Sequence, residues 1–135
     1  MTSTSLKPKI LVVEDQPDVL KTMLYLLKRV GCETAGAQTG AEAMRLLTVG
    51  KFDLITLDID LPDTTGLELC RRLKRDLHLC QIPVIFVTGR LCELNRQHCF
   101  EIGAADYIVK PFDAYVFVSR IFFHLKTAQR FAAGC

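Results

Sequence analysis

Short apolar runs rich in valine and isoleucine alternate along this chain with segments of helical periodicity, and this alternation is the strongest constraint on its fold. Four of the runs cover residues 10–13, 52–57, 84–87 and 107–109. Runs of this length and composition are typical of strands buried in a parallel sheet. Strands that alternate with helical segments predict an α/β fold with a parallel sheet.

The remaining elements follow from helical spacing and turn residues. A short strand is expected over residues 33–37, and residues 61–63 (Leu-Pro-Asp) are expected to form a loop. Asp113 is expected to cap the last helix. The first predicted helix follows Asp15 and ends at Gly31. Three more are expected over residues 41–50, 67–76 and 91–102, and the last is expected to run from 114 to about 131.

The length of the chain fits one domain. At 135 residues it is long enough to bury a sizeable core, and no internal repeat or low-complexity linker divides it. We expect a domain over residues 9–131, preceded by a disordered or extended segment over 1–8 and followed by a tail over 132–135.

Composition and charge argue against several classes of function. The formal net charge of +2 is too small to indicate direct nucleic-acid binding, and the basic cluster at 71–75 is interpreted as a solvated helix face. No apolar segment reaches the length of a membrane span, and no signal peptide is visible. The six cysteines form no CxxC pair and no zinc-ligand spacing, so we expect free thiols in a reducing cytosol and a cytoplasmic protein.

The four longer runs each stop at residues suited to phosphate and magnesium chemistry. The first is followed by Glu14 and Asp15, the second by Asp58, the third by Thr88 and the fourth by Lys110. Ligands of open parallel sheets bind at the carboxyl ends of the strands, so these side chains are expected to converge. Two carboxylates ~4 Å apart repel by about 4 kcal/mol at an effective dielectric near 20, so three of them favour a cation. Oxygen ligands of this kind suit Mg²⁺.

Four motifs, in order and at matching spacing, resemble the response-regulator receiver domain from one end of the chain to the other. They are residues 11–15 (LVVED), residues 57–63 (LDIDLPD) with Gly66, residues 87–89 (VTG) and residues 103–112 (GAADYIVKPF). The resemblance implies a doubly wound, five-stranded parallel sheet with helices on both faces, the (βα)5 flavodoxin-like fold.

The resemblance also implies roles for the site residues. Asp58 is then the phosphoacceptor, and Mg²⁺ is held by Glu14, Asp15, Asp58 and the main-chain carbonyl of Asp60. Thr88 and Lys110 contact the phosphoryl group, the Lys110-Pro111 bond is cis, and Tyr107 is the aromatic switch residue. The implied partner is a sensor histidine kinase or a phosphotransfer protein.

Two further features concern tuning and partners. Asp60 and Arg90 are expected at the mouth of the site, where a pair between them would slow loss of phosphate; two solvated charges are an equal alternative. On the last helix, Ala114, Tyr115, Phe117, Val118, Ile121, Phe122, Leu125 and Ala128 are predicted to dock on the sheet. Val116 and Phe123 lie opposite, as a candidate surface for a homodimer or an output element.

Two alternative interpretations remain open. The sequence around Asp58 and Asp60 also resembles the nucleophile motif of haloacid-dehalogenase-like phosphatases, but there the acidic metal pair follows the nucleophile, whereas Glu14 and Asp15 precede Asp58. The chain could also be a receiver module of a larger hybrid kinase or multidomain regulator.

Overall fold

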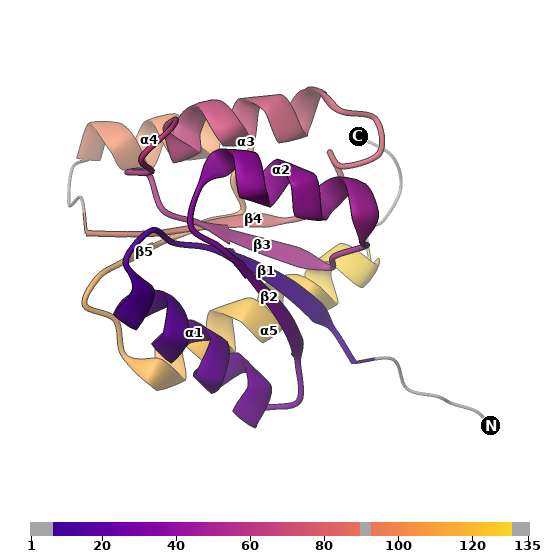
Figure 1. Ribbon diagram of the computed structural model, residues 1–135, viewed down its shortest axis with the longest axis vertical. Helices are drawn as coiled ribbons and strands as arrows, with labels where there is room; N and C mark the ends of the chain where they lie inside the picture. Colours follow the sequence, from indigo (N-terminus) through magenta and orange to yellow (C-terminus); the bar gives the residue numbers. More distant parts are fainter. Residues whose placement is uncertain (1–6, 90–92, 131–135) are drawn as a thin grey trace.

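A computed structural model describes residues 7–89 and 93–130 of the chain (Figure 1). The described residues form a five-stranded, parallel sheet in the order β2-β1-β3-β4-β5. The strands are β1 (Lys9–Val13), β2 (Glu33–Ala37), β3 (Leu54–Leu57), β4 (Val84–Thr88) and β5 (Asp106–Val109). This order belongs to the flavodoxin-like fold, so the predicted α/β architecture is confirmed.

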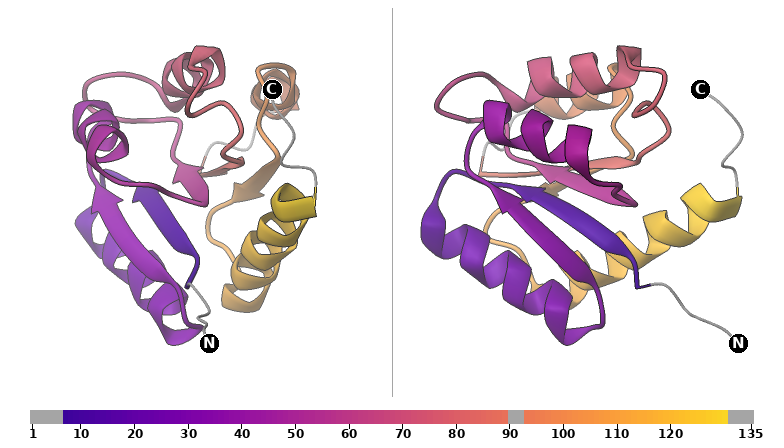
Figure 2. Two further views of the ribbon diagram at one scale, coloured as in Figure 1. Left: turned by 90° about the vertical axis from the view of Figure 1, so that its right-hand side faces the viewer. Right: turned by 45° about the vertical axis from the view of Figure 1, so that its right-hand side comes forward.

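Five helices cover the two faces of the sheet. They are α1 (Pro17–Arg29), α2 (Gly40–Val49), α3 (Gly66–Arg75), α4 (Glu93–Glu101) and α5 (Ala114–Arg130). Helices α1 and α5 lie against one face, and α2, α3 and α4 lie against the other (Figure 2). The strands β1, β3 and β4 are therefore buried on both faces, which explains their largely apolar sequences, whereas the edge strand β2 is only partly buried.

Alternate residues of each strand supply two separate cores. In β1, Leu11 and Val13 pack under α2, α3 and α4, while Ile10 and Val12 pack under α1 and α5. Phe117 and Ile121 of α5 are fully buried in the second core, as the helical spacing predicted.

The ends of the helices follow the expected local signals. Gly31 and Gly103 adopt positive φ angles of 94° and 107°, a region that glycine enters without strain. Asp113 Oδ1 accepts hydrogen bonds from the backbone N–H groups of Tyr115 at 2.8 Å and Val116 at 3.2 Å, so its capping role is confirmed. Helix α4 ends at Glu101, one residue before the predicted end at 102, and residues 91 and 92 lie outside the described residues.

The start of α5 corrects one prediction. Ala114 and Tyr115 were expected on the docked face, but both are exposed, and Tyr115 is 80% exposed. Both residues lie in the first helical turn, which precedes the buried Phe117, so helical spacing alone placed them too early against the sheet.

The basic cluster of α3 also differs from its prediction in one residue. Lys74 is partly buried, and its ammonium donates hydrogen bonds to the carbonyls of Cys80 at 3.1 Å and Ile82 at 3.0 Å. Burial lowers the pKa of Lys74. It is therefore a support of the loop before β4 rather than a solvated charge.

The prediction of free thiols is wrong for Cys80, which is disulfide-bonded. Cys32, Cys70 and Cys99 are free and buried, and burial raises the pKa of the Cys99 thiol to about 12. Cys92 and Cys135 lie outside the described residues. The spacing of the cysteines did not predict the bond at Cys80.

Within residues 7–89 and 93–130, no helix is long and apolar enough to cross a membrane.

Candidate functional site

The pairing of β1 with β3 brings three carboxylates together at the carboxyl edge of the sheet. Val13 is in register with Leu57, and the Asp58 N–H donates to the Val13 carbonyl at 3.1 Å. The residues that follow the two strands are therefore neighbours. One carboxylate oxygen from each of Glu14, Asp15 and Asp58 lies within 4.8 Å of the others.

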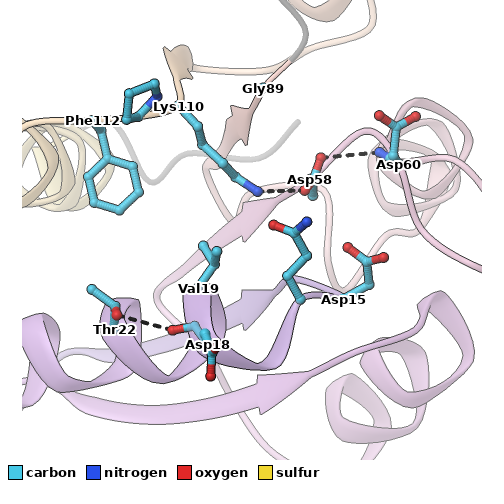
Figure 3. Close-up of a pocket in the computed structure, with 11 residues that line it drawn as sticks. Asp15, Asp18, Val19, Thr22, Asp58, Asp60, Gly89, Lys110 and Phe112 are labelled. Atoms are coloured by element: carbon cyan, nitrogen blue, oxygen red, sulfur yellow. Dashed lines mark hydrogen bonds and ion pairs between the residues drawn. The ribbon is translucent and has the colours of Figure 1, made fainter.

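Lys110 neutralises two of these acids. Its Nζ lies 2.5 Å from Glu14 Oε1 and 2.8 Å from Asp58 Oδ2 (Figure 3 shows the contact with Asp58). The Glu14 side chain is only 1% exposed and that of Lys110 is 15% exposed. The expected cis peptide bond between Lys110 and Pro111 is present.

Burial and pairing together set the electrostatics of the site. Burial raises the pKa of Glu14, and the hydrogen bond from Lys110 opposes that shift. Burial alone would lower the pKa of Lys110, but its hydrogen bonds to Asp58 and Glu14 outweigh this cost and raise it. Lys110 therefore carries its positive charge at neutral pH.

The loop between β3 and α3 folds back tightly on Asp58. The Asp60 N–H donates to Asp58 Oδ1 at 3.2 Å, and the Gly66 N–H donates to the Ile59 carbonyl at 2.8 Å. A Cβ atom at Gly66 would lie 2.1 Å from the Asp58 carbonyl oxygen, so no other residue fits without moving the backbone. Asp60 is exposed at the rim of the site.

A cavity of about 720 Å³ opens beside the acids and Lys110. Figure 3 shows Asp15, Asp58, Asp60 and Lys110 around one end of the cavity, and Val19 and Phe112 further along it. The cavity thus joins a charged end to an apolar end, and Asp15 and Asp58 both line it.

Thr88 and Tyr107 occupy the neighbouring strands β4 and β5. Thr88 is fully buried, and its carbonyl accepts a hydrogen bond from the Lys110 N–H at 2.8 Å. Tyr107 is 5% exposed, and the guanidinium of Arg96 in α4 lies over its ring at 5.5 Å from the centroid. No feature of the sequence predicted this contact of Arg96 with Tyr107.

The structure brings most of the predicted site residues together. Glu14, Asp15, Asp58 and Lys110 converge, and Asp60 lies beside them. Arg90 lies outside the described residues, so its pairing with Asp60 stays a prediction. Val116 and Phe123 are 37% and 62% exposed on α5, as expected for a surface.

The donor set fits Mg²⁺. Carboxylates from Glu14, Asp15 and Asp58 offer oxygen ligands only, which is the chemistry that this small, hard cation prefers. Asp15 is only partly buried and lines the open cavity, which leaves room for the waters that Mg²⁺ usually keeps.

Comparison with known proteins gives one consistent family. Residues 10–122 match the family described as "Response regulator receiver domain". The phosphate regulon transcriptional regulatory protein PhoB of Pseudomonas aeruginosa is 39% identical over 112 residues, which cover 83% of this chain and 49% of the relative. The chain spans 27% to 54% of the length of the curated relatives compared with it.

Solved structures agree with this match. A CheY-like receiver domain protein from Methanospirillum hungatei superposes with a TM-score of 0.87 at 27% identity, over 93% of this chain and 98% of that one. The receiver domain of a signal transduction histidine kinase from Syntrophus aciditrophicus gives a TM-score of 0.84 at 34% identity, over 91% and 93%.

Proposed function

The chain belongs to the response regulator receiver domain family, and we propose that Asp58 accepts a phosphoryl group from the phosphohistidine of a sensor kinase or phosphotransfer protein. As a receiver domain it is a signalling phosphoacceptor rather than an enzyme with turnover on a substrate. The family match decides against the haloacid-dehalogenase-like phosphatase interpretation. The observation that carries the proposal is the Asp58 carboxylate, which borders an open cavity beside Lys110, Glu14 and Asp15.

In the proposed reaction, a carboxylate oxygen of Asp58 attacks the phosphorus atom of the phosphohistidine. The O–P bond forms as the P–N bond breaks, and the ring nitrogen of the donor histidine leaves with the electron pair. Such transfers ask the protein mainly for positioning and for positive charge near the transferring oxygens. Lys110 supplies that charge, because its ammonium already lies 2.8 Å from Asp58.

Mg²⁺ is the cofactor in this proposal, held by Glu14, Asp15, Asp58 and the main-chain carbonyl of Asp60. When bound, the cation offsets negative charge on the acids and on the phosphoryl oxygens. Thr88 adds a hydroxyl donor to the phosphoryl group.

The output of the proposed switch passes through Thr88 and Tyr107. Phosphorylation adds negative charge that draws Thr88 toward the phosphoryl group, and Tyr107 occupies the space that Thr88 leaves. The cation–π contact from Arg96 favours the buried position of the Tyr107 ring, which couples α4 to the switch. Val116 and Phe123 on α5 are then the proposed contact for a homodimer or an output element.

The bounds of the domain, and whether it stands alone or is part of a longer protein, also belong to the proposal. The domain division at residues 9–131, with short segments at 1–8 and 132–135, stays a prediction, as does the pairing of Asp60 with Arg90. A receiver that stands alone and a receiver that belongs to a larger kinase or regulator are both compatible with relatives about twice as long.

The proposal is tested by incubation of the protein with acetyl phosphate and Mg²⁺, followed by mass spectrometry under conditions that preserve acyl phosphates. We expect one added phosphoryl group on Asp58, absent in Asp58→Ala. Asp53→Asn is a matched control, because Asp53 is an exposed aspartate just before β3, at the opposite end of that strand from Asp58. Label on another residue, or none in the wild type, would contradict the proposal.

A further inference from the structure

We infer that Asp63 is a positioning residue for the phosphoryl and magnesium site, because its carboxylate ties the loop that carries Asp58 and Asp60 to the first turn of α2. The inference rests on the proposed function and extends it to a residue to which no role was assigned above. Asp63 was expected only as part of a loop.

Both oxygens of the Asp63 carboxylate are used. Oδ1 accepts the Gly40 N–H at 2.8 Å, and Oδ2 accepts the Ala41 N–H at 2.9 Å. These are the first two residues of α2, whose N–H groups have no partner inside the helix. A carboxylate also complements the positive end of a helix dipole. These two hydrogen bonds lower the pKa of Asp63, so it is ionised at neutral pH.

The contact between the loop and α2 is close as well as polar. A Cβ atom at Gly40 would lie 2.5 Å from Thr64 Cγ2, the residue next to Asp63. The backbone of α2 therefore lies so close to the Thr64 side chain that this side chain would have to move if residue 40 carried a Cβ atom. Side-chain hydrogen bonds and packing at the same point fix the tip of the loop against the helix.

Asp63 completes a chain of hydrogen bonds that links the three loops around the site. The Asp58 N–H donates to the Val13 carbonyl, and the Glu14 N–H donates to the Ala37 carbonyl at 2.9 Å. Both links are made by backbone atoms, so neither uses a side-chain atom. The link from the loop after Asp58 to α2, which follows Ala37 closely in the chain, is made by the Asp63 side chain.

The base of this loop is held by its own backbone, but its tip is not. Asp60 pairs with Thr65 in an isolated antiparallel bridge, and the Gly66 N–H closes on Ile59. Asp63 lies at the tip, three residues after Asp60. Without the Asp63 carboxylate, the tip of the loop loses its hydrogen bonds to α2, and the segment that presents the Asp60 main-chain carbonyl is held only at its base. Loss of such indirect support typically lowers metal affinity by about 10-fold or more.

The test compares Asp63→Ala with Thr39→Ala. Thr39 caps the same helix, because its hydroxyl accepts the Glu42 N–H at 3.0 Å, and this hydrogen bond lies within the helix end rather than between the helix and the loop after Asp58. Both variants therefore remove a cap from α2, and only one releases the loop. Two readouts are measured: amide hydrogen exchange in metal-free protein, and Mg²⁺ affinity by calorimetry.

We expect Asp63→Ala to speed exchange at Gly40 and Ala41 and to weaken Mg²⁺ binding by about 10-fold. Thr39→Ala should speed exchange at Glu42 and bind Mg²⁺ as the wild type does. Asp63→Asn keeps one strong acceptor oxygen and should give an intermediate affinity. It also serves as the test variant if Asp63→Ala does not fold.

Two contrary results are distinguishable. If Asp63→Ala and Thr39→Ala bind Mg²⁺ equally, Asp63 only stabilises α2 and the inference is overturned while the proposed function stands. If the wild type itself binds no Mg²⁺, the proposed function fails and the inference falls with it.

Discussion

The Lys110 ammonium lies 2.8 Å from Asp58 Oδ2, although 52 positions separate the two residues in the chain. The contact depends on strand order: β1 and β3 are neighbours, and β5 ends at the same edge of the sheet. The Lys110 ammonium thus contacts both Glu14 and Asp58, two buried carboxylates that would otherwise repel each other.

Substitution of Lys110 by methionine should destabilise the metal-free protein. Lys110→Met leaves the buried carboxylates of Glu14 and Asp58 without a counter-charge, and broken buried pairs typically cost about 3 kcal/mol. Urea unfolding at neutral pH measures the loss. Lys126→Met, on an exposed part of α5, is the control and should change stability little. Equal midpoints for Lys110→Met and wild type would show that the ion pairs contribute nothing.

Substitution of Gly66 by alanine should be strongly destabilising. The added methyl group would meet the Asp58 carbonyl oxygen at 2.1 Å, and forced overpacking costs about 1–3 kcal/mol. Gly89→Ala is the matched control, because a Cβ atom there meets nothing within 4 Å. Thermal unfolding of both variants tests the prediction, which fails if Gly66→Ala melts with Gly89→Ala.

The stabilising effect of Asp63 should depend on pH. The hydrogen bonds from the Gly40 and Ala41 N–H groups hold the folded-state pKa of Asp63 below its ordinary value, so its contribution is present above the ordinary pKa and is lost as pH falls through the folded pKa. The difference in unfolding free energy between wild type and Asp63→Ala should therefore shrink under strongly acidic conditions. The difference for Thr39→Ala should not follow this pattern, since a hydroxyl does not titrate. If the difference in unfolding free energy from the wild type is constant with pH for both variants, the proposed interaction of the ionised Asp63 carboxylate with the N-terminus of α2 is contradicted.

The exposed residues of α5 give a prediction about assembly. If Phe123 contributes to a homodimer, Phe123→Asp should shift the sedimentation profile of phosphorylated protein toward the monomer. Tyr25→Asp removes an aromatic side chain of similar exposure on α1 and should leave the profile unchanged. Identical monomers in wild type and Phe123→Asp would exclude this dimer.

Much of the fold and of the acidic cluster could be predicted from the sequence, because both depend on local rules. Buried parallel strands are apolar throughout, and their carboxyl ends meet at one edge. Glu14, Asp15, Asp58 and Lys110 therefore converge as soon as the runs before them are assigned as strands. The caps at Asp113 and the turns at Gly31 and Gly103 also depend on a few adjacent residues.

What escaped prediction depends on contacts between distant segments. Asp63 caps a helix that begins 23 positions earlier, and Arg96 lies over the ring of Tyr107 from another element. Lys74 serves the loop before β4, and Cys80 is in a disulfide. The prediction that Tyr115 docks on the sheet was wrong for a different reason. Helical spacing assigns a residue to a face of the helix, and it does not say at which turn the helix reaches the sheet.

Calorimetric titration with Mg²⁺ tests the central claim most directly, namely that Glu14, Asp15 and Asp58 form one cation site beside Lys110. We predict that the wild-type protein binds one Mg²⁺ per chain and that Asp15→Asn, which removes one charged ligand without changing the size of the side chain, loses this binding. A titration without heat for the wild type, or an affinity unchanged in Asp15→Asn, would contradict it.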